Sequence, residues 1–92
     1  MNVDELQASM LGNGPQRGEV YRHYKGGLYL VLGQCLREGD LKIEVVYKNL
    51  LTGSVWSRTL FDWNEMVLPN DSNEEVSRFE YTGHFLNLAD VW

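Results

Sequence analysis

Aromatic and basic side chains suited to a binding surface occur at several points of the sequence. The run Tyr21–Tyr24 places two phenol rings, a guanidinium and an imidazole in consecutive positions, and Trp56 stands two residues before Arg58. Flat rings and guanidinium planes stack on nucleic-acid bases, and a guanidinium binds phosphate or carboxylate through paired N–H donors. Small β-barrels with exposed rings also hold extended peptides. The whole set comprises Tyr21, Arg22, His23, Tyr24, Tyr47, Trp56, Arg58, Arg78 and Phe79.

Part of this set forms the predicted ligand-binding surface. Alternate residues of a strand share a face, so Tyr21 and His23 are expected on one side of their strand. Trp56 and Arg58 share a face with Leu60 in the same way, which predicts that one of these three is half-buried. The predicted site residues are Tyr21, His23, Tyr47, Trp56, Arg58 and Arg78.

The same residues also have a purely structural interpretation. A small domain uses rings to fill its core, and the charged side chains around a core are usually solvated. Arg78 lies two residues before Glu80, so an ion pair on the strand surface would occupy its guanidinium without any ligand. The sequence leaves both interpretations open.

Residues with metal-binding or nucleophilic chemistry are few and poorly spaced. His23 and His84 are the only histidines, and no pair of ligands has metal-site spacing. Cys35 is the only cysteine, which excludes an internal disulfide, and its place in an apolar strand predicts a small buried side chain. The acidic loop Asp71–Glu75 lacks the glycine and alternating spacing of a calcium loop, and no glycine run matches a phosphate loop. We therefore expect no metal, no cofactor and no enzyme activity.

The charge of the chain is uneven. The 92 residues carry a net charge of −5 at pH 7, with six basic and three acidic side chains in residues 20–60 but one basic and seven acidic in residues 61–92. Strong non-specific binding of nucleic acid requires net positive charge, although the basic middle leaves a local anion site open. The lone cysteine, the acidic N-terminus and the absence of an apolar run of about 20 residues predict a cytoplasmic protein without membrane contact.

Short β-strands must position the candidate residues. Gly26 and Gly27 supply the positive backbone angles of a hairpin turn after the first strand. Short strands separated by turns at this spacing predict a mainly β domain, a small five-stranded barrel. Alternating apolar and polar residues place the strands at Glu19–Tyr24, Leu28–Leu36, Leu41–Lys48, Val55–Leu60 and Val76–Tyr81.

Helical segments are expected at two places. Asn2 and Glu5 form a capping pair that begins a short amphipathic helix over residues 3–11. Residues 1–14 are thus an accessory helix and connector, and residues 15–92 are the barrel domain with a C-terminal tail. Asp62 and Glu65 form a second capping pair and predict one helical turn after the fourth strand, with a hydrophobic contact between Phe61 and Met66. The tail is open to a helical or an extended reading, and either terminal segment could contact a second copy in a homodimer.

Three blocks carry a family resemblance: YRHYKGGLYLVLG (residues 21–33), VVYKNLLTGSVWSR (residues 45–58) and SRFEY (residues 77–81). In this order they resemble the family catalogued as domain of unknown function 1653, small proteins of bacteria and their phages. The resemblance covers about residues 18–81, and YRHYKG is its most specific element. Thr59 stands where the family pattern usually has proline. The resemblance implies an SH3-like barrel and no established activity.

These observations favour a non-catalytic binding module that recognises a protein or peptide partner through an aromatic-basic face of the barrel. The alternative is a nucleic-acid or nucleotide binder using the same face, with a phage-encoded counter-defence or regulatory role. A small enzyme is a weaker hypothesis, because so short a chain has little room for a pocket with several converging polar groups.

Overall fold

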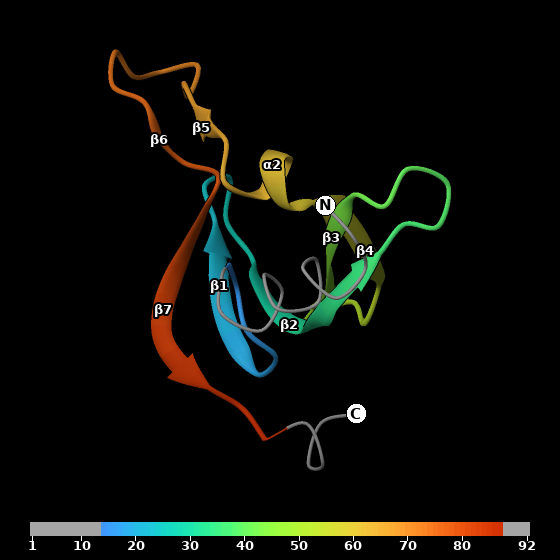
Figure 1. Cartoon of the computed structure of the whole chain (residues 1–92). Helices are drawn as coiled ribbons and strands as arrows, with labels where there is room; N and C mark the ends of the chain where they lie inside the picture. Colours follow the sequence, from blue (N-terminus) through green and yellow to red (C-terminus); the bar gives the residue numbers. More distant parts are fainter. Residues whose placement is uncertain (1–13, 88–92) are drawn as a thin grey trace.

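The computed structural model describes residues 14–87, which form a mainly β domain with little helix (Figure 1). This confirms the mainly β part of the predicted fold class. The predicted helix over residues 3–11 and the tail residues 88–92 lie outside the described residues, and the division into an accessory segment and a domain stays a prediction. In chain order the elements are β1 (Glu19–His23), β2 (Leu28–Leu36), β3 (Ile43–Asn49), β4 (Val55–Thr59), α2 (Leu60–Trp63), β5 (Met66–Val67), β6 (Val76–Ser77) and β7 (Phe79–Phe85).

Five strands form one antiparallel sheet in the order β4-β3-β2-β1-β7, while β5 and β6 pair separately. Successive hairpins connect β1 with β2, β2 with β3 and β3 with β4. The other side of β1 pairs with β7. In Figure 1, β5 and β6 project beyond the upper end of the main sheet. No pairing between β4 and β7 closes the sheet of residues 14–87, so the mainly β prediction is confirmed but the closed SH3-like barrel is not.

The predicted fifth strand, Val76–Tyr81, is wrong as a single element. Val76 and Ser77 pair with β5, whereas Phe79 begins β7 beside β1. Arg78 separates the two, because its N–H donates to the Glu65 carbonyl at 3.3 Å and its carbonyl accepts the Tyr24 N–H at 3.0 Å. These bonds turn the backbone from one sheet to the other, and no alternation of residue types announces them.

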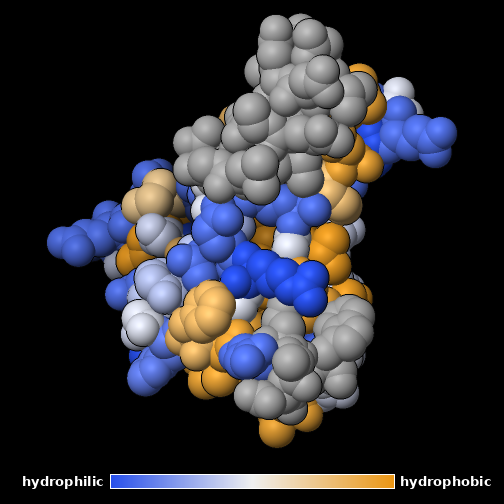
Figure 2. Space-filling view, turned by 60° about the horizontal axis from the view of Figure 1, so that its bottom comes forward, coloured by the Kyte–Doolittle hydropathy of each residue, from blue (hydrophilic) through white to orange (hydrophobic). Residues whose placement is uncertain are grey.

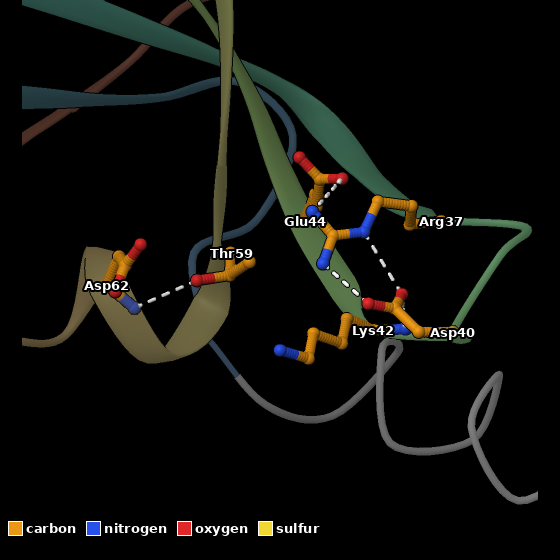
Figure 3. Close-up of polar contacts among 6 residues, drawn as sticks. All are labelled: Arg37, Asp40, Lys42, Glu44, Thr59 and Asp62. Atoms are coloured by element: carbon orange, nitrogen blue, oxygen red, sulfur yellow. Dashed lines mark hydrogen bonds and ion pairs between the residues drawn. The ribbon is translucent and has the colours of Figure 1, made fainter.

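The helical turn after β4 exists, but it begins earlier than predicted. Thr59 is the N-cap, and its hydroxyl accepts the Asp62 N–H at 3.2 Å (Figure 3). A proline at this position would supply no such acceptor. The predicted hydrophobic contact of Phe61 is wrong, since its side chain is 82% exposed while Trp63 is buried. No helix in residues 14–87 is long and apolar enough to span a membrane.

The turn between β2 and β3 is held by charge, as Figure 3 shows. The Arg37 guanidinium donates to both carboxylate oxygens of Asp40, at 3.0 and 2.6 Å, and lies 3.8 Å from Glu44. The Asp40 carboxylate also accepts the Lys42 N–H. The hydrogen bond from Arg37, followed by that from Lys42, lowers the pKa of Asp40 to about 2.

Both faces of the sheet bury apolar side chains. What we call the aliphatic face is built on Val20, Leu30 and Leu32, with Val46 and Leu86 packed against them. Gly18 lets the chain cross at its edge, because a Cβ there would meet the Phe85 ring at 2.5 Å. The opposite side, which we call the aromatic face, carries the side chains of Tyr21, His23, Tyr29, Val31, Val45, Tyr47, Trp56, Arg58, Phe79 and Tyr81.

Candidate functional site

The strand register brings five of the six predicted site residues to the aromatic face. Tyr47 pairs with Trp56, and Val45 pairs with Arg58, so β3 and β4 present these side chains together. Tyr21 and His23 lie two residues apart on β1 and point to the same face of the sheet. Partners in an antiparallel pair point to the same side of the sheet. The sixth residue, Arg78, reaches this region from the bend before β7.

Interlocked rings form the centre of the aromatic face. Trp63 of α2 stacks on Phe79 with ring centroids 3.8 Å apart, and the Tyr47 ring meets both edge-on at 5.2 and 5.4 Å. Tyr21 packs edge-on against Trp63 at 5.1 Å. Tyr47 is only 5% exposed. The structural interpretation therefore holds for the Tyr47 and Phe79 rings, which are core.

Trp56 and Arg58 occupy the outer part of the face. Trp56 is 57% exposed and makes no ring contact within the described residues. Arg58 is half-buried, and its Nε donates to the Tyr47 hydroxyl at 3.4 Å. Leu60 is also half-buried, so two members of this group of three are half-buried where one was expected. Of the six predicted site residues, Trp56 is the exposed one, and Arg58 beside it is half-buried like Tyr21, His23 and Arg78.

Arg78 has a structural attachment of its own. Its Nε donates to the Asp62 carbonyl at 3.2 Å, its Nη2 lies 3.6 Å from the Glu65 carboxylate, and its side chain is 18% exposed. The acidic partner is thus Glu65 and not Glu80, which stands opposite Arg22 in the sheet. Arg78 therefore connects α2 and the residues after it to the start of β7. Its contact with a ligand stays a prediction.

His23 sits among rings and cations. Its ring lies 5.1 Å from Phe79, and its Nδ1 accepts the Lys25 N–H at 3.1 Å. Burial, followed by the charges of Arg78, Arg58 and Lys25, lowers the pKa of His23. The neutral imidazole therefore carries its hydrogen on Nε2, because Nδ1 is the acceptor.

Tyr21 is tied to an acid of its own strand. Its hydroxyl donates to the Glu19 carboxylate at 3.1 Å. Burial raises the pKa of Tyr21, and the Glu19 charge and hydrogen bond add to this shift. The phenol is thus occupied inside the protein and leaves mainly its ring edge, beside Tyr81 at 5.3 Å, for other contacts.

Cys35 was expected to be buried, and this is wrong: its side chain is exposed. A register shift between Val31 and Gly33 changes which residues of β2 face inward, and Cys35 then pairs with Glu44. Partial desolvation of its sulfur, followed by the Glu44 charge, raises the pKa of the thiol. Within residues 14–87, no group of three or more histidine, cysteine, aspartate or glutamate side chains gathers into a metal site.

Sequence reasoning missed a groove on the aliphatic face. It has a volume of about 510 Å³. Alternation within a strand does not predict that the exposed side chains of Leu28, Leu50 and Phe85 line one groove. Their neighbours are set by the pairing of strands that are distant in sequence. Figure 2 shows hydrophobic surface interrupted by hydrophilic side chains on the side of the molecule that it displays. The lining residues are Val20, Arg22, Leu28, Leu50, Glu80, Tyr81, Thr82, His84, Phe85 and Leu86.

Comparisons with known proteins agree with the resemblance in the sequence blocks. The profile of the family DUF1653, described as a protein of unknown function, matches residues 19–81. The structure is similar to the crystal structure of a protein belonging to DUF1653 from Bordetella bronchiseptica, with a TM-score of 0.67 and 34% sequence identity. That similarity covers 85% of this chain and 97% of the other. A search of curated proteins gives no match.

Proposed function

This chain belongs to the DUF1653 family, whose description names no activity, and we propose from its surface that it is a module that binds a protein or peptide partner through the aromatic face. The observation that carries the proposal is Trp56, a large exposed ring on the edge strand β4, beside Arg58. Tryptophan and arginine are the side chains that most often dominate binding energy at protein interfaces. The buried rings behind them pack against one another, and we expect a strand backed by such packing to lose little entropy on binding.

A binding role fits the residues better than a catalytic one. Cys35 is the strongest nucleophile of the chain in principle, but desolvation and the Glu44 charge raise its pKa, which lowers the fraction of the reactive thiolate. It also pairs with Glu44, on the side of the sheet opposite His23. The negative charge of Glu44 opposes ionisation of the thiol, and no described residue donates to or accepts from its sulfur as a base would.

The alternative function, binding of a nucleic acid or nucleotide, has one observation in its favour. Trp56 could stack on a base while the Arg58 guanidinium contacts phosphate. The net charge of −5 opposes long nucleic acids, so a single nucleotide is the better form of this hypothesis. The salt dependence of binding separates the two, because phosphate contacts give a steep dependence and peptide docking a shallow one.

We further propose that the sheet is of the SH3-like class and that the protein works in the cytoplasm. The support for the SH3-like class is that the first strand pairs with both the second strand and β7, and that a short helix follows β4. A single exposed cysteine suits a reducing compartment. Both statements stand as proposals beside the binding function.

The proposed function is tested by selecting random linear peptides displayed on phage against the immobilised protein. Enriched peptides are then synthesised and their affinity is measured by fluorescence anisotropy. We expect Trp56→Ala to weaken binding at least about ten-fold, in line with the loss of a central ring. Phe61→Ala is the matched control, because Phe61 is also an exposed ring but lies on α2. Peptides that bind both variants equally, or no enrichment at all, would contradict the proposal.

A further inference from the structure

We propose that Arg58 and the Tyr47 hydroxyl form a carboxylate-recognition site, reached by an acidic, extended peptide segment that adds as a further strand beside β4. This inference rests on the proposed function and names the chemistry of its partner. It uses two neighbouring groups of the aromatic face that keep hydrogen-bond donors without a partner among residues 14–87.

Arg58 has an uncommon position for a half-buried cation. Within residues 14–87 no carboxylate lies within 4 Å of it, whereas Arg37 has Asp40 and Arg78 has Glu65. Its Nε donates to the Tyr47 hydroxyl at 3.4 Å, and both Nη groups have no hydrogen-bond partner among the described residues. A partly desolvated guanidinium without an acid is costly, and a carboxylate that arrives with a ligand removes that cost.

The Tyr47 hydroxyl complements this arrangement. Since its oxygen accepts a hydrogen bond from Arg58, its own O–H is available as a donor, and no described residue accepts it. The ring below is fixed on several sides by Tyr29, Trp63 and Phe79, so the hydroxyl cannot swing away. A carboxylate can therefore take two N–H donors from Arg58 and one O–H donor from Tyr47.

The surroundings are positive. The charges of Arg78, Arg58 and Lys25 all act on His23, so these cations lie around one part of the aromatic face. Glu65 offsets only part of the Arg78 charge, because its carboxylate is 3.6 Å from the guanidinium and is exposed to solvent. A single negative group gains from this potential, while the strongly acidic remainder of the chain repels a long polyanion.

The edge strand β4 supplies the backbone contacts. It pairs only with β3 among the described strands, in a continuous register over Glu44–Lys48. The Asn49 N–H donates to the Ser54 carbonyl, so by alternation the backbone groups of Val55 and Ser57 point to the free side of β4. Unpaired N–H and C=O groups on a regular edge bind extended segments by strand addition.

The opposite edge of the sheet is less suited to strand addition. β7 contains Gly83 in a left-handed conformation, with a φ of +83°, and its pairing with β1 shifts register between Glu19 and Tyr21. Such irregularities curve an edge and interrupt its ladder. β4 has neither feature, and it is also the edge that carries Trp56 and Arg58.

This geometry defines the ligand. Side chains on one face of an added strand are two residues apart, the same spacing as Trp56 and Arg58. The segment should therefore carry an apolar or aromatic residue two positions from an aspartate or glutamate. One charge is recognised, and it belongs to a side chain because the strand continues past it in both directions.

The probe is the peptide Thr-Val-Thr-Phe-Thr-Glu-Thr-Val, acetylated and amidated so that the glutamate is its only charge, compared with its glutamine counterpart. Binding to the full chain is followed by NMR, including the Nε–H signals of arginine. We expect the glutamate peptide to bind about ten-fold more tightly, with the Arg58 signal shifting most. Arg58→Ala should abolish the difference between the peptides, and Tyr47→Phe should reduce it several-fold.

Arg22→Ala is the matched control, since Arg22 also has no carboxylate within 4 Å among the described residues but lies on the other side of the sheet. It should keep the full difference between the two peptides. Equal binding of both peptides to the unaltered protein would overturn the carboxylate site. So would a preference that survives in Arg58→Ala, or a response to ADP and inorganic phosphate with none to either peptide.

The phage selection keeps this inference separate from the proposed function. Trp56-dependent peptides enriched in an acid two positions from an apolar residue support both. Trp56-dependent peptides without such an acid overturn the carboxylate site and leave the binding function intact. Failure of Trp56→Ala to affect any selected peptide overturns the function and the site together.

Discussion

The two faces of the sheet bury apolar surface in different ways. On the aromatic face, Tyr47, Trp63 and Phe79 contact one another at angles set by their rings. The Tyr47 hydroxyl accepts a hydrogen bond from Arg58, and the neighbouring Tyr21 hydroxyl donates to Glu19. On the aliphatic face, Leu30 and Leu32 pack without directional contacts and leave a groove beside them. The comparison teaches that one face joins its apolar packing to hydrogen bonds of its polar ring groups, whereas the other buries aliphatic side chains and leaves a groove open.

The largest effect should come from removing the ring that closes the aromatic face. Trp63→Ala is expected to cost about 3–5 kcal/mol of unfolding free energy, since the stacked Phe79 and the edge-on Tyr47 lose their partner. Urea denaturation followed by circular dichroism measures this. Phe61→Ala, in the same helix but exposed, should change stability by less than about 0.5 kcal/mol. Similar losses in the two variants would remove the distinction between ring core and surface.

Within the aliphatic face, the loss of unfolding free energy on truncation to alanine should depend steeply on how deeply the side chain is buried. Leu30 is almost fully buried, and Leu30→Ala is expected to cost about 2–5 kcal/mol. Leu28 is exposed at the groove, so Leu28→Ala should cost well below that, about 1 kcal/mol or less. The same urea experiment compares them. A larger loss at Leu28 would show that the groove is filled by other parts of the protein and that Leu28 is core.

The stabilisation that Tyr21 contributes to the folded protein should also decrease at alkaline pH. The pKa of Tyr21 is raised in the folded protein, by burial and then by Glu19, above its ordinary value of 10.0. A raised folded pKa gives stability that is complete below pH 10 and is lost as pH rises above it. Tyr21→Phe should therefore flatten the fall of the urea midpoint above pH 10. Tyr24→Phe, in the hairpin turn, serves as the control and should keep the slope of the unaltered protein.

The smallest effect should be a change in one titration. Arg58 is among the cations that lower the pKa of His23, after burial and Arg78. Arg58→Ala should raise that pKa towards the ordinary value of 6.5, while Arg22→Ala on the other face should leave it in place. NMR titration of the imidazole signals measures both. An unchanged His23 pKa in Arg58→Ala would separate these groups and weaken the case for a shared positive region.

Local patterns predicted most of the strands and the composition of the aromatic face. β1 to β4 follow from alternation, and the shared side of Tyr21 and His23, or of Trp56 and Arg58, follows from strand parity. Which of these rings are buried did not follow. Alternation tells which residues share a face, but the Tyr47 ring is core because Trp63 from α2 and Phe79 from β7 pack against it.

The amino-acid sequence by itself determined the mainly β class, the hairpin order and the local excess of cations, because each depends on near neighbours along the chain. Tertiary structure alone decided that Arg78 pairs with Glu65, that Val76–Tyr81 divides at Arg78, and that Arg58 meets the Tyr47 hydroxyl instead of an acid. It also turned Cys35 outward through a register shift. The physical reason is common to all four: each contact joins residues that only strand pairing brings together, and the choice among competing polar partners depends on distances that exist only after the sheet has formed.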